Sequence, residues 1–301
     1  MELTVAGKRV VIVGFGASGE AAARLCVRQG AARVVLNDKR DAADIKDAKI
    51  LGMVREGVSL DLGAHRADTF ASADLVVVSP GVPPLDVLTE VEERGVPVIS
   101  EIELASWFID APILAITGTN GKSTVTSLIG EILKESGYTT FTGGNLGTPL
   151  CDAVGTAATR ADGRVVVEVS SFQLERILYF RPAVAVYLNA TPDHLDRYGN
   201  FAEYAATKAR VFMNQSGIDH AVVPADDPVV SAFARAYAAR VHTYGGEQSP
   251  VRIAGESIVG VDGTQYPLAM LKIKGTHNVS NAMAAVLAAH LGGATPEATF
   301  S

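Results

Sequence analysis

Residues 118–124 read Gly-Thr-Asn-Gly-Lys-Ser-Thr and lie between a stretch that predicts a strand and a stretch that predicts a helix. Residues 112–117 are largely apolar, as in a buried strand, and residues 123–136 place apolar side chains at helical spacing. Glycines let the backbone approach an anion, and the first amides of a helix bind phosphate. A lysine able to reach terminal phosphates and a hydroxyl for Mg²⁺ complete the set. The stretch therefore predicts a nucleoside triphosphate site.

The spacing of this loop departs from the Walker pattern, which has four residues between its first glycine and Gly-Lys. Only two residues separate Gly118 from Gly121. The alternative is a glycine-rich turn with an incidental lysine, but the flanking strand and helix favour phosphate binding.

The chain as a whole has the composition of a globular protein. Its 301 residues suggest two domains, and 48% hydrophobic residues suffice for two cores. The net charge of −7 argues against broad nucleic-acid binding, which needs clustered Lys and Arg. Cys26 and Cys151 fit neither a disulfide framework nor a metal motif, so we expect core thiols. With no signal peptide and no membrane-spanning stretch in the sequence, we expect a cytoplasmic protein, and a monomer.

Short β-branched runs alternate with helical runs from residue 9 to residue 99, which predicts an α/β fold with a parallel sheet covered by helices. The pattern restarts after an expected connecting helix at 101–109. We therefore place a boundary near Asp110, which gives domains 1–110 and 111–301. The expected strands are 9–13, 33–37, 74–79 and 96–99 in the first domain, and 112–117, 164–169, 183–188 and 219–223 in the second.

The last part of the chain follows a different pattern. Residues 241–273 are rich in glycine and in short alternating segments, which predicts an antiparallel edge. An alanine-rich helix is expected at 278–291. Residues 294–301 read as the start of a further helix, so we expect the chain to be cut short at its C-terminus.

A second glycine loop follows the first expected strand, where residues 14–19 read Gly-Phe-Gly-Ala-Ser-Gly, and Asp38 ends the second strand. Alone, this spacing predicts NAD binding. Many parallel α/β domains use the same turn for other nucleotides or for none, so the choice stays open. Lys39 and Arg40 either add positive charge to the site or are solvated. Residues 79–81, at the same sheet edge, are either a ligand contact or an ordinary turn.

Ionisable residues at the strand ends of the second domain are candidates for chemistry. Glu168 lies in an apolar strand, where it is either a Mg²⁺ ligand or part of a structural ion pair. His194 follows the next strand and could be a metal ligand, a general base or a turn residue. Lys208, on the helix expected at 201–214, is by default a surface lysine. Asn278 and Asn281 open the last helix, where capping is the simpler explanation.

Four motifs in this order along the chain resemble the Mur ligases. They are the phosphate loop at 116–124, Ser-Ser-Phe-Gln-Leu-Glu at 170–175, Asp-His-Leu-Asp-Arg-Tyr at 193–198 and His-Asn at 277–278. The resemblance covers essentially the whole chain. It implies a Rossmann-like N-terminal parallel-sheet domain that holds UDP, followed by a P-loop-type central ATPase domain.

The resemblance also implies an activity. It indicates a cytoplasmic, ATP- and Mg²⁺-dependent ligase of peptidoglycan biosynthesis. Residues 170–175 and the Arg197-Tyr198 ending favour the member that adds D-glutamate to UDP-N-acetylmuramoyl-L-alanine through an acyl phosphate. Lys208 matches the family lysine that is carbamylated, which replaces a cation by a carboxylate-like anion for a second Mg²⁺.

Position by position, the resemblance implies four sets of site residues. The ATP set is Gly118, Thr119, Asn120, Gly121, Lys122, Ser123, Thr124, Asn278 and Asn281. The metal set is Ser123, Glu168, His194 and Lys208, and the catalytic set is Lys122, Glu168, His194 and Lys208. The UDP set is Ala17, Ser18, Asp38, Lys39, Arg40, Ser79, Pro80 and Gly81, and the muramoyl-alanine set is Asn145, Ser171, Gln173 and His194.

Members of the family have a third domain that supplies D-glutamate contacts and closes over ATP, and this chain ends before it. We therefore expect its 301 residues to bind the UDP-sugar and the nucleotide but to ligate weakly or not at all. Two other functions stay open. One is an NAD-dependent oxidoreductase built on the first glycine loop, which leaves the second loop unexplained. The other is a non-catalytic nucleotide-binding protein.

Overall fold

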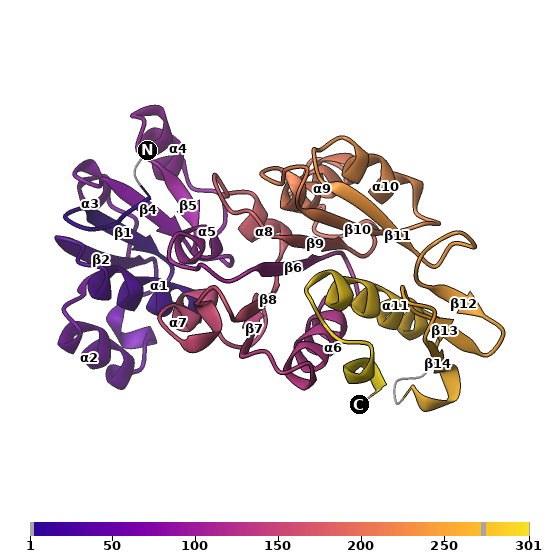
Figure 1. The fold of residues 1–301 in the computed structure, drawn as a ribbon. Helices are drawn as coiled ribbons and strands as arrows, with labels where there is room; N and C mark the ends of the chain where they lie inside the picture. The colour runs from indigo at the N-terminus through magenta and orange to yellow at the C-terminus, as the bar shows by residue number, and fades with distance from the viewer. Residues whose placement is uncertain (1–2, 272–274, 301) are drawn as a thin grey trace. The chain divides into compact units, whose positions relative to one another are not determined.

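The computed structural model describes residues 3–271 and 275–300 and divides the chain into two compact units. The first unit contains the chain up to Phe108 together with Thr148–Val154 and Glu175–Leu178, and the second contains the remainder. Each unit has its own parallel sheet (Figure 1). Two short segments beyond Asp110 thus pack with the first unit, which a division of the sequence at one residue does not anticipate.

The first unit is built on a five-stranded parallel sheet in the order β3-β2-β1-β4-β5. Its strands are β1 (Arg9–Val13), β2 (Arg33–Asp38), β3 (Ser59–Leu62), β4 (Leu75–Val78) and β5 (Val98–Ser100). Its helices are α1 (Ala17–Arg28), α2 (Asp47–Arg55), α3 (Ala67–Ala71), α4 (Asp86–Glu93), α5 (Glu101–Ser106) and α7 (Leu150–Ala153). The predicted α/β class is confirmed. The edge strand β3 was not predicted, because half of its residues are polar.

Helices cover both faces of this sheet. Val11 and Val13 pack in one core cluster with Phe70 of α3 and Leu88 of α4. On β1 the intervening side chains alternate to the other face, which α1 covers. Burial on both faces explains why the parallel strands are valine-rich runs rather than alternating ones.

Three helices of the first unit, α1, α5 and α7, pack against one another around a buried carboxyl group. Glu101 is 1% exposed, and its Oε1 accepts a 2.6 Å hydrogen bond from the Cys151 amide. Its Oε2 has no hydrogen-bond partner among the described residues. Burial raises the pKa of Glu101 to about 7, against the partly compensating bonds from Cys151. Cys26 and Cys151 are both buried and free, as predicted.

Glu101→Gln is expected to remove a pH-dependent loss of stability. The folded pKa is raised to about 7 from the usual 4.5, so the carboxyl group's stabilisation is complete below the unfolded pKa and is lost as the pH rises through the folded pKa. Relative to the wild type, the variant should gain about 1–3 kcal/mol of unfolding free energy between about pH 4.5 and about pH 8. Urea denaturation at both pH values measures this difference.

Glu103→Gln is the matched control on the same helix. Its carboxylate accepts from Trp107 Nε1 at 2.8 Å and from the Leu178 amide at 3.0 Å. The control should lower stability at both pH values. Parallel pH profiles for wild type and Glu101→Gln would contradict the expected titration.

The second unit is built on a six-stranded parallel sheet in the order β11-β10-β9-β6-β8-β7. Its strands are β6 (Ile113–Thr117), β7 (Thr140–Gly144), β8 (Arg164–Glu168), β9 (Val184–Tyr187), β10 (His220–Pro224) and β11 (Arg240–Tyr244). Its helices are α6 (Lys122–Glu135), α8 (Ser171–Leu174), α9 (Phe201–Ala209), α10 (Pro228–Arg235) and α11 (Thr276–Leu291). Apolar residues of α6 and α11 form one core with β6, β8, β9 and β10, while α9 and α10 lie on the opposite face (Figure 1).

The antiparallel edge expected at 241–273 is corrected in part. β11 runs parallel to β10, with His220 opposite Arg240, because α10 returns the chain to the start of the sheet before β11 begins. The antiparallel strands form a separate sheet of β12 (Arg252–Ala254), β13 (Ser257–Val259) and β14 (Gln265–Pro267). Residues 272–274 of the expected segment lie outside the described residues. None of the helices in the described part of the chain is long and apolar enough to cross a membrane.

Candidate functional site

The phosphate loop joins β6 to α6 and depends on two glycines. Gly118 has a φ of 149°, and Gly121, the N-cap of α6, has a φ of 84°. Both angles lie where residues with a Cβ are strained. Glycine at the N-cap also leaves the first amides of α6 without a capping side chain, so they are available to an anion.

Gly121→Ala is expected to destabilise the protein and to weaken ADP binding. An added Cβ would lie 2.4 Å from Oδ1 of Asn281, so Asn281 would be displaced in addition to the backbone strain. We expect a loss of about 2–3 kcal/mol of unfolding free energy. The matched control is Gly137→Ala, where φ is also positive, at 88°, but an added Cβ meets no atom within 4 Å. Equal losses of stability and of ADP affinity in the two variants would show that the contact with Asn281 is unimportant.

Lys122 folds back over the loop. Its Nζ donates to the carbonyl oxygens of Gly118 and Thr119 at 3.0 Å and 2.9 Å. The ammonium group thus lies at the loop itself, where it can exchange these carbonyl contacts for phosphate oxygens.

Glu168 ends β8 and faces the start of α6. It is 3% exposed, and its two oxygens accept from Ser123 Oγ at 2.6 Å and from Asn145 Nδ2 at 3.0 Å. A hydroxyl and a carboxylate are the hard oxygen ligands that Mg²⁺ prefers, so the pair fits that ion. The structure brings no three His, Cys, Asp or Glu side chains together as a metal site within residues 3–271 and 275–300. Mg²⁺ sites with few protein ligands are usual where phosphates supply the others.

Lys208 lies on α9 and is 2% exposed, contrary to the default for a lysine. Burial lowers the pKa of Lys208 to about 7. The charge of Lys122 lowers it further, while Asp193 and Glu168 oppose the shift. These three charges place Lys208 in the same electrostatic environment as the phosphate loop. A large fraction of the amine is therefore neutral near neutral pH.

Aromatic rings connect Lys208 with the His194 loop. Nζ of Lys208 lies 4.8 Å from the centre of the Tyr204 ring, and the His194 ring lies 6.2 Å from that ring. His194 has a φ of 51°, which is unusual for a residue other than glycine. Its side chain is half exposed, with Nε2 3.6 Å from Asp193 and the ring 4.9 Å from Phe172. The side chains of His194 and Lys208 therefore both lie near the Tyr204 ring.

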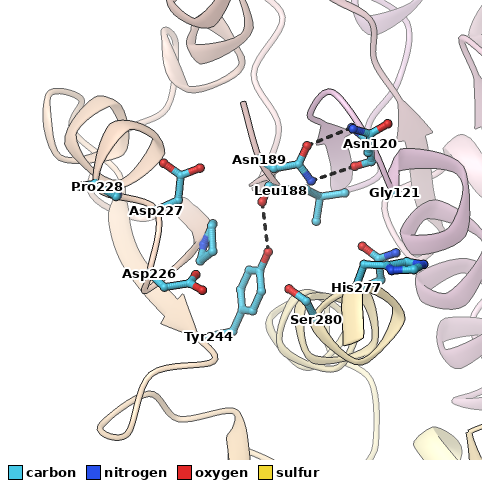
Figure 2. A pocket seen from close by; sticks show the side chains of 12 residues that line it. Asn120, Gly121, Leu188, Asn189, Asp226, Asp227, Pro228, Tyr244, His277 and Ser280 are labelled. Atoms are coloured by element: carbon cyan, nitrogen blue, oxygen red, sulfur yellow. Dashed lines mark hydrogen bonds between the residues drawn. The ribbon is translucent and has the colours of Figure 1, made fainter. Parts of the chain in front are cut away.

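A cavity of about 670 Å³ lies between the phosphate loop and the start of α11 (Figure 2). Asn281 lines it, and Asn278 supports Asn281 by accepting a 3.3 Å hydrogen bond from Nδ2. The remaining lining residues are Asn120, Gly121, Leu188, Asn189, Pro224, Asp226, Asp227, Pro228, Tyr244, His277 and Ser280.

The sequence did not identify Asp226, Asp227 and Tyr244 as lining residues. Asp226 and Asp227 lie across the cavity from Asn120 (Figure 2). Asp227 also caps α10 by accepting from the amides of Val229 and Val230, both at 3.0 Å. The sequence signal for this side of the cavity was the pair of carboxylates that follows a buried strand.

Of the residues expected to contact the muramoyl-alanine part, Ser171 and Gln173 are buried, whereas Asn145 and His194 are exposed. Ser171 is 2% exposed and Gln173 0%. Oε1 of Gln173 accepts from the amide and hydroxyl of Ser170, both at 3.0 Å. Nδ2 of Asn145 donates a hydrogen bond to Glu168, so Asn145 lies at the predicted metal site.

The first glycine loop surrounds Asp38 in the first unit. The Asp38 carboxylate accepts four hydrogen bonds: from the Phe15 amide at 2.6 Å, and from the amide, Nε and Nη2 of Arg40 at 2.9, 3.0 and 2.8 Å. Burial alone would raise the pKa of Asp38, but the bonds from Arg40 and Phe15 outweigh it and lower the pKa to about 2. In NAD-binding domains the equivalent acid accepts a ribose hydroxyl. Here its acceptor positions are filled, which argues against NAD.

The other residues expected to bind UDP lie at the same carboxyl edge of the first sheet. Ser79 follows β4 directly, and its hydroxyl donates to the Gly14 carbonyl at 3.1 Å. The exposed or half-exposed members are Ala17, Ser18, Lys39, Arg40, Pro80 and Gly81. They leave an open edge at which the start of α1 is uncapped by a side chain.

Two family models match the two units. The model described as the N-terminal domain of MurD-like Mur ligases matches residues 8–100. The model of the Mur ligase middle domain matches residues 116–289, more than half of the chain. The chain belongs to the Mur ligase family. The predicted family is therefore confirmed.

Several curated Mur ligases have similar sequences. The UDP-N-acetylmuramoylalanine–D-glutamate ligase of Geobacter metallireducens is 44% identical over 301 residues, which cover 95% of this chain and 64% of the relative. The enzyme of the same name from Anaeromyxobacter dehalogenans is 46% identical over 97% of this chain and 65% of its own. This chain spans slightly less than two thirds of these relatives.

Solved Mur ligase structures share the fold. A UDP-N-acetylmuramate:L-alanyl-γ-D-glutamyl-meso-diaminopimelate ligase from Neisseria meningitides superposes with a TM-score of 0.62 at 17% identity, covering 96% of this chain and 99% of that chain. The MurF ligase from Thermotoga maritima, solved in complex with ADP, gives a TM-score of 0.53 at 16% identity, covering 98% of this chain and 65% of that chain. These two structures support the fold alone.

Proposed function

We propose that this Mur ligase joins D-glutamate to UDP-N-acetylmuramoyl-L-alanine at the expense of ATP. The observation that carries the proposal is the phosphate loop, where the uncapped start of α6, Lys122 and the Ser123–Glu168 pair come together. Curated relatives that are 44% and 46% identical support the choice of amino acid and acceptor.

In the proposed reaction, a carboxylate oxygen of the muramoyl-alanine attacks the γ-phosphorus of ATP, and ADP leaves. The amine of D-glutamate then attacks the acyl phosphate, and inorganic phosphate leaves from the tetrahedral intermediate. Lys122 and the amides of α6 stabilise the charge on the transferred phosphoryl group. Mg²⁺, when bound to Ser123 and Glu168, supplies further neutralisation of the phosphates.

We further propose that Lys208 carries a carbamate. Its buried amine, with a pKa of about 7, is neutral often enough to attack CO₂ and release a proton. The product is an anion at a position where the unmodified chain would bury a cation. This anion would then help to organise a second metal ion.

We propose that the first unit holds the UDP part, through Arg40, which Asp38 orients, and through the open edge around Ala17. The test is a calorimetric titration of the chain with UDP-N-acetylmuramoyl-L-alanine, UDP and NADH, each in a separate experiment. The UDP compounds should bind, and NADH should not. Tight NADH binding without UDP binding would overturn the assignment in favour of an oxidoreductase.

Ligation itself is tested by phosphate release from ATP with the product of the complete gene. Release should need both UDP-N-acetylmuramoyl-L-alanine and D-glutamate. A product that binds ADP and UDP but releases no phosphate with both substrates present would instead be a non-catalytic nucleotide-binding protein.

A further inference from the structure

The side chain of Asn189, which follows β9, holds the phosphate loop at Asn120. Its Oδ1 accepts from the Asn120 amide at 2.9 Å, and its Nδ2 donates to the Asn120 carbonyl at 3.0 Å (Figure 2). A side-chain amide has both a donor and an acceptor, so it pairs both polar groups of one loop residue at once. The two bonds fix the orientation of the loop immediately before Gly121.

The backbone next to Asn189 continues this contact. The Asn189 carbonyl accepts from the Thr119 amide at 3.1 Å. The hydroxyl of Thr119 donates to the Thr191 carbonyl at 3.2 Å and accepts from the Thr191 amide at 3.1 Å. Residues 189–191 therefore lie along 119–120 as a hydrogen-bonded pair of segments, which we call the loop clamp.

Ordering the phosphate loop costs conformational entropy, and the hydrogen bonds of the loop clamp offset that cost. Residues between two glycines with positive φ lose much backbone entropy when they are ordered. Without the clamp, the loop amides would sample orientations that do not converge on an anion. The Asn120 amide is paired in this arrangement, because it donates to Oδ1 of Asn189.

The clamp also connects two parts of the proposed site. Residues 189–191 lead directly into Asp193 and His194, so the position of the phosphate loop is set by the loop that carries the proposed metal ligand. We propose that Asn189 is a positioning residue that holds the phosphate loop in its anion-binding form and couples it to the His194 loop. This inference rests on the proposed ATP site of the second unit.

The test compares ligands with and without phosphate. In Asn189→Ala, the affinity of the chain for ADP should fall by about tenfold or more, which corresponds to about 1.4 kcal/mol or more. Its affinity for adenosine, followed by NMR titration, should stay within about twofold of wild type, since adenosine needs no loop amide. If Asn189 only stabilised the fold, its replacement would weaken the binding of ADP and of adenosine to the same extent.

Two further variants keep the result interpretable. Asn214→Ala is the matched control, because Nδ2 of Asn214 also bonds a backbone carbonyl, that of Phe180 at 3.1 Å, away from the loop. It should lower the melting temperature without changing ADP affinity. Thr119→Val removes the hydroxyl bonds to Thr191 and the 3.3 Å contact with the Tyr204 hydroxyl, and it should weaken ADP binding by about threefold.

The outcomes separate this inference from the proposed function. A wild-type chain that binds no ADP would overturn both. If the wild type binds ADP but Asn189→Ala weakens ADP and adenosine equally, or leaves ADP affinity unchanged, the positioning role of Asn189 is wrong while the nucleotide site stands.

Discussion

Lys208→Ala is expected to lower the rate of amide-bond formation by at least about a thousandfold. The buried amine at this position is the proposed carrier of a carbamate, and alanine provides no anion for the second metal ion. The rate is measured as phosphate release by the product of the complete gene. Because the variant leaves space for a small carboxylate, added formate or acetate should restore part of the activity. Near-normal turnover without added carboxylate would refute the role of Lys208.

A second measurement on Lys208 does not depend on turnover. With ¹³C-labelled bicarbonate, the wild-type chain should show a carbamate signal in NMR spectra that Lys208→Ala lacks. Carbamate formation needs the neutral amine, and the pKa of Lys208 is lowered to about 7. The signal should therefore grow as the pH rises from about 6 to about 8. A labelled carbamate that persists in the alanine variant would assign the modification to another lysine.

Lys122→Ala is expected to weaken ADP binding by about a hundredfold. The ammonium group lies 3.0 Å and 2.9 Å from two loop carbonyl oxygens, so its charge is at the loop itself. Charge-assisted bonds to phosphate are about twice as strong as neutral ones, so the loss should exceed that of any single loop amide. Calorimetric titration of the chain with ADP measures it.

Lys134→Ala is the control for the loss of one positive charge on the same helix. Lys134 lies near the end of α6 and pairs at 2.7 Å with the exposed Glu131. It should leave ADP affinity unchanged. If both lysine variants weakened ADP binding to the same extent, the effect of Lys122 would be one of net charge rather than of contact.

The sequence predicted most of the architecture because the signal for a buried parallel strand is local. Valine-rich runs identified β1, β4 and β8, which are covered on both faces. β7 was missed because Thr140–Gly144 contains threonines and glycines instead of an apolar run. The parallel pairing of β11 depends on a crossover through α10, which its own residues do not encode.

The candidate site was predicted where a residue type is informative at its own position. The glycines, Lys122 and Ser123 of the phosphate loop are of this kind. The burial of Lys208 depends on tertiary packing, and its pKa depends on that burial and on the charges of Lys122, Asp193 and Glu168, so helix periodicity gave no indication of either. Asn189 was part of a polar loop in the sequence, and its role emerged only from the reciprocal bonds to Asn120.

The discontinuous first unit has a consequence for how the chain is made. The hydrogen-bond donors to its two buried carboxyl groups lie far along the sequence. Glu101 accepts from the Cys151 amide, and Glu103 accepts from the Leu178 amide. During synthesis the ribosome must release residue 178 before this unit can complete its packing, by which time β6, α6 and β8 have also emerged. A fragment that stops at Phe108 therefore leaves both carboxyl groups without these backbone donors.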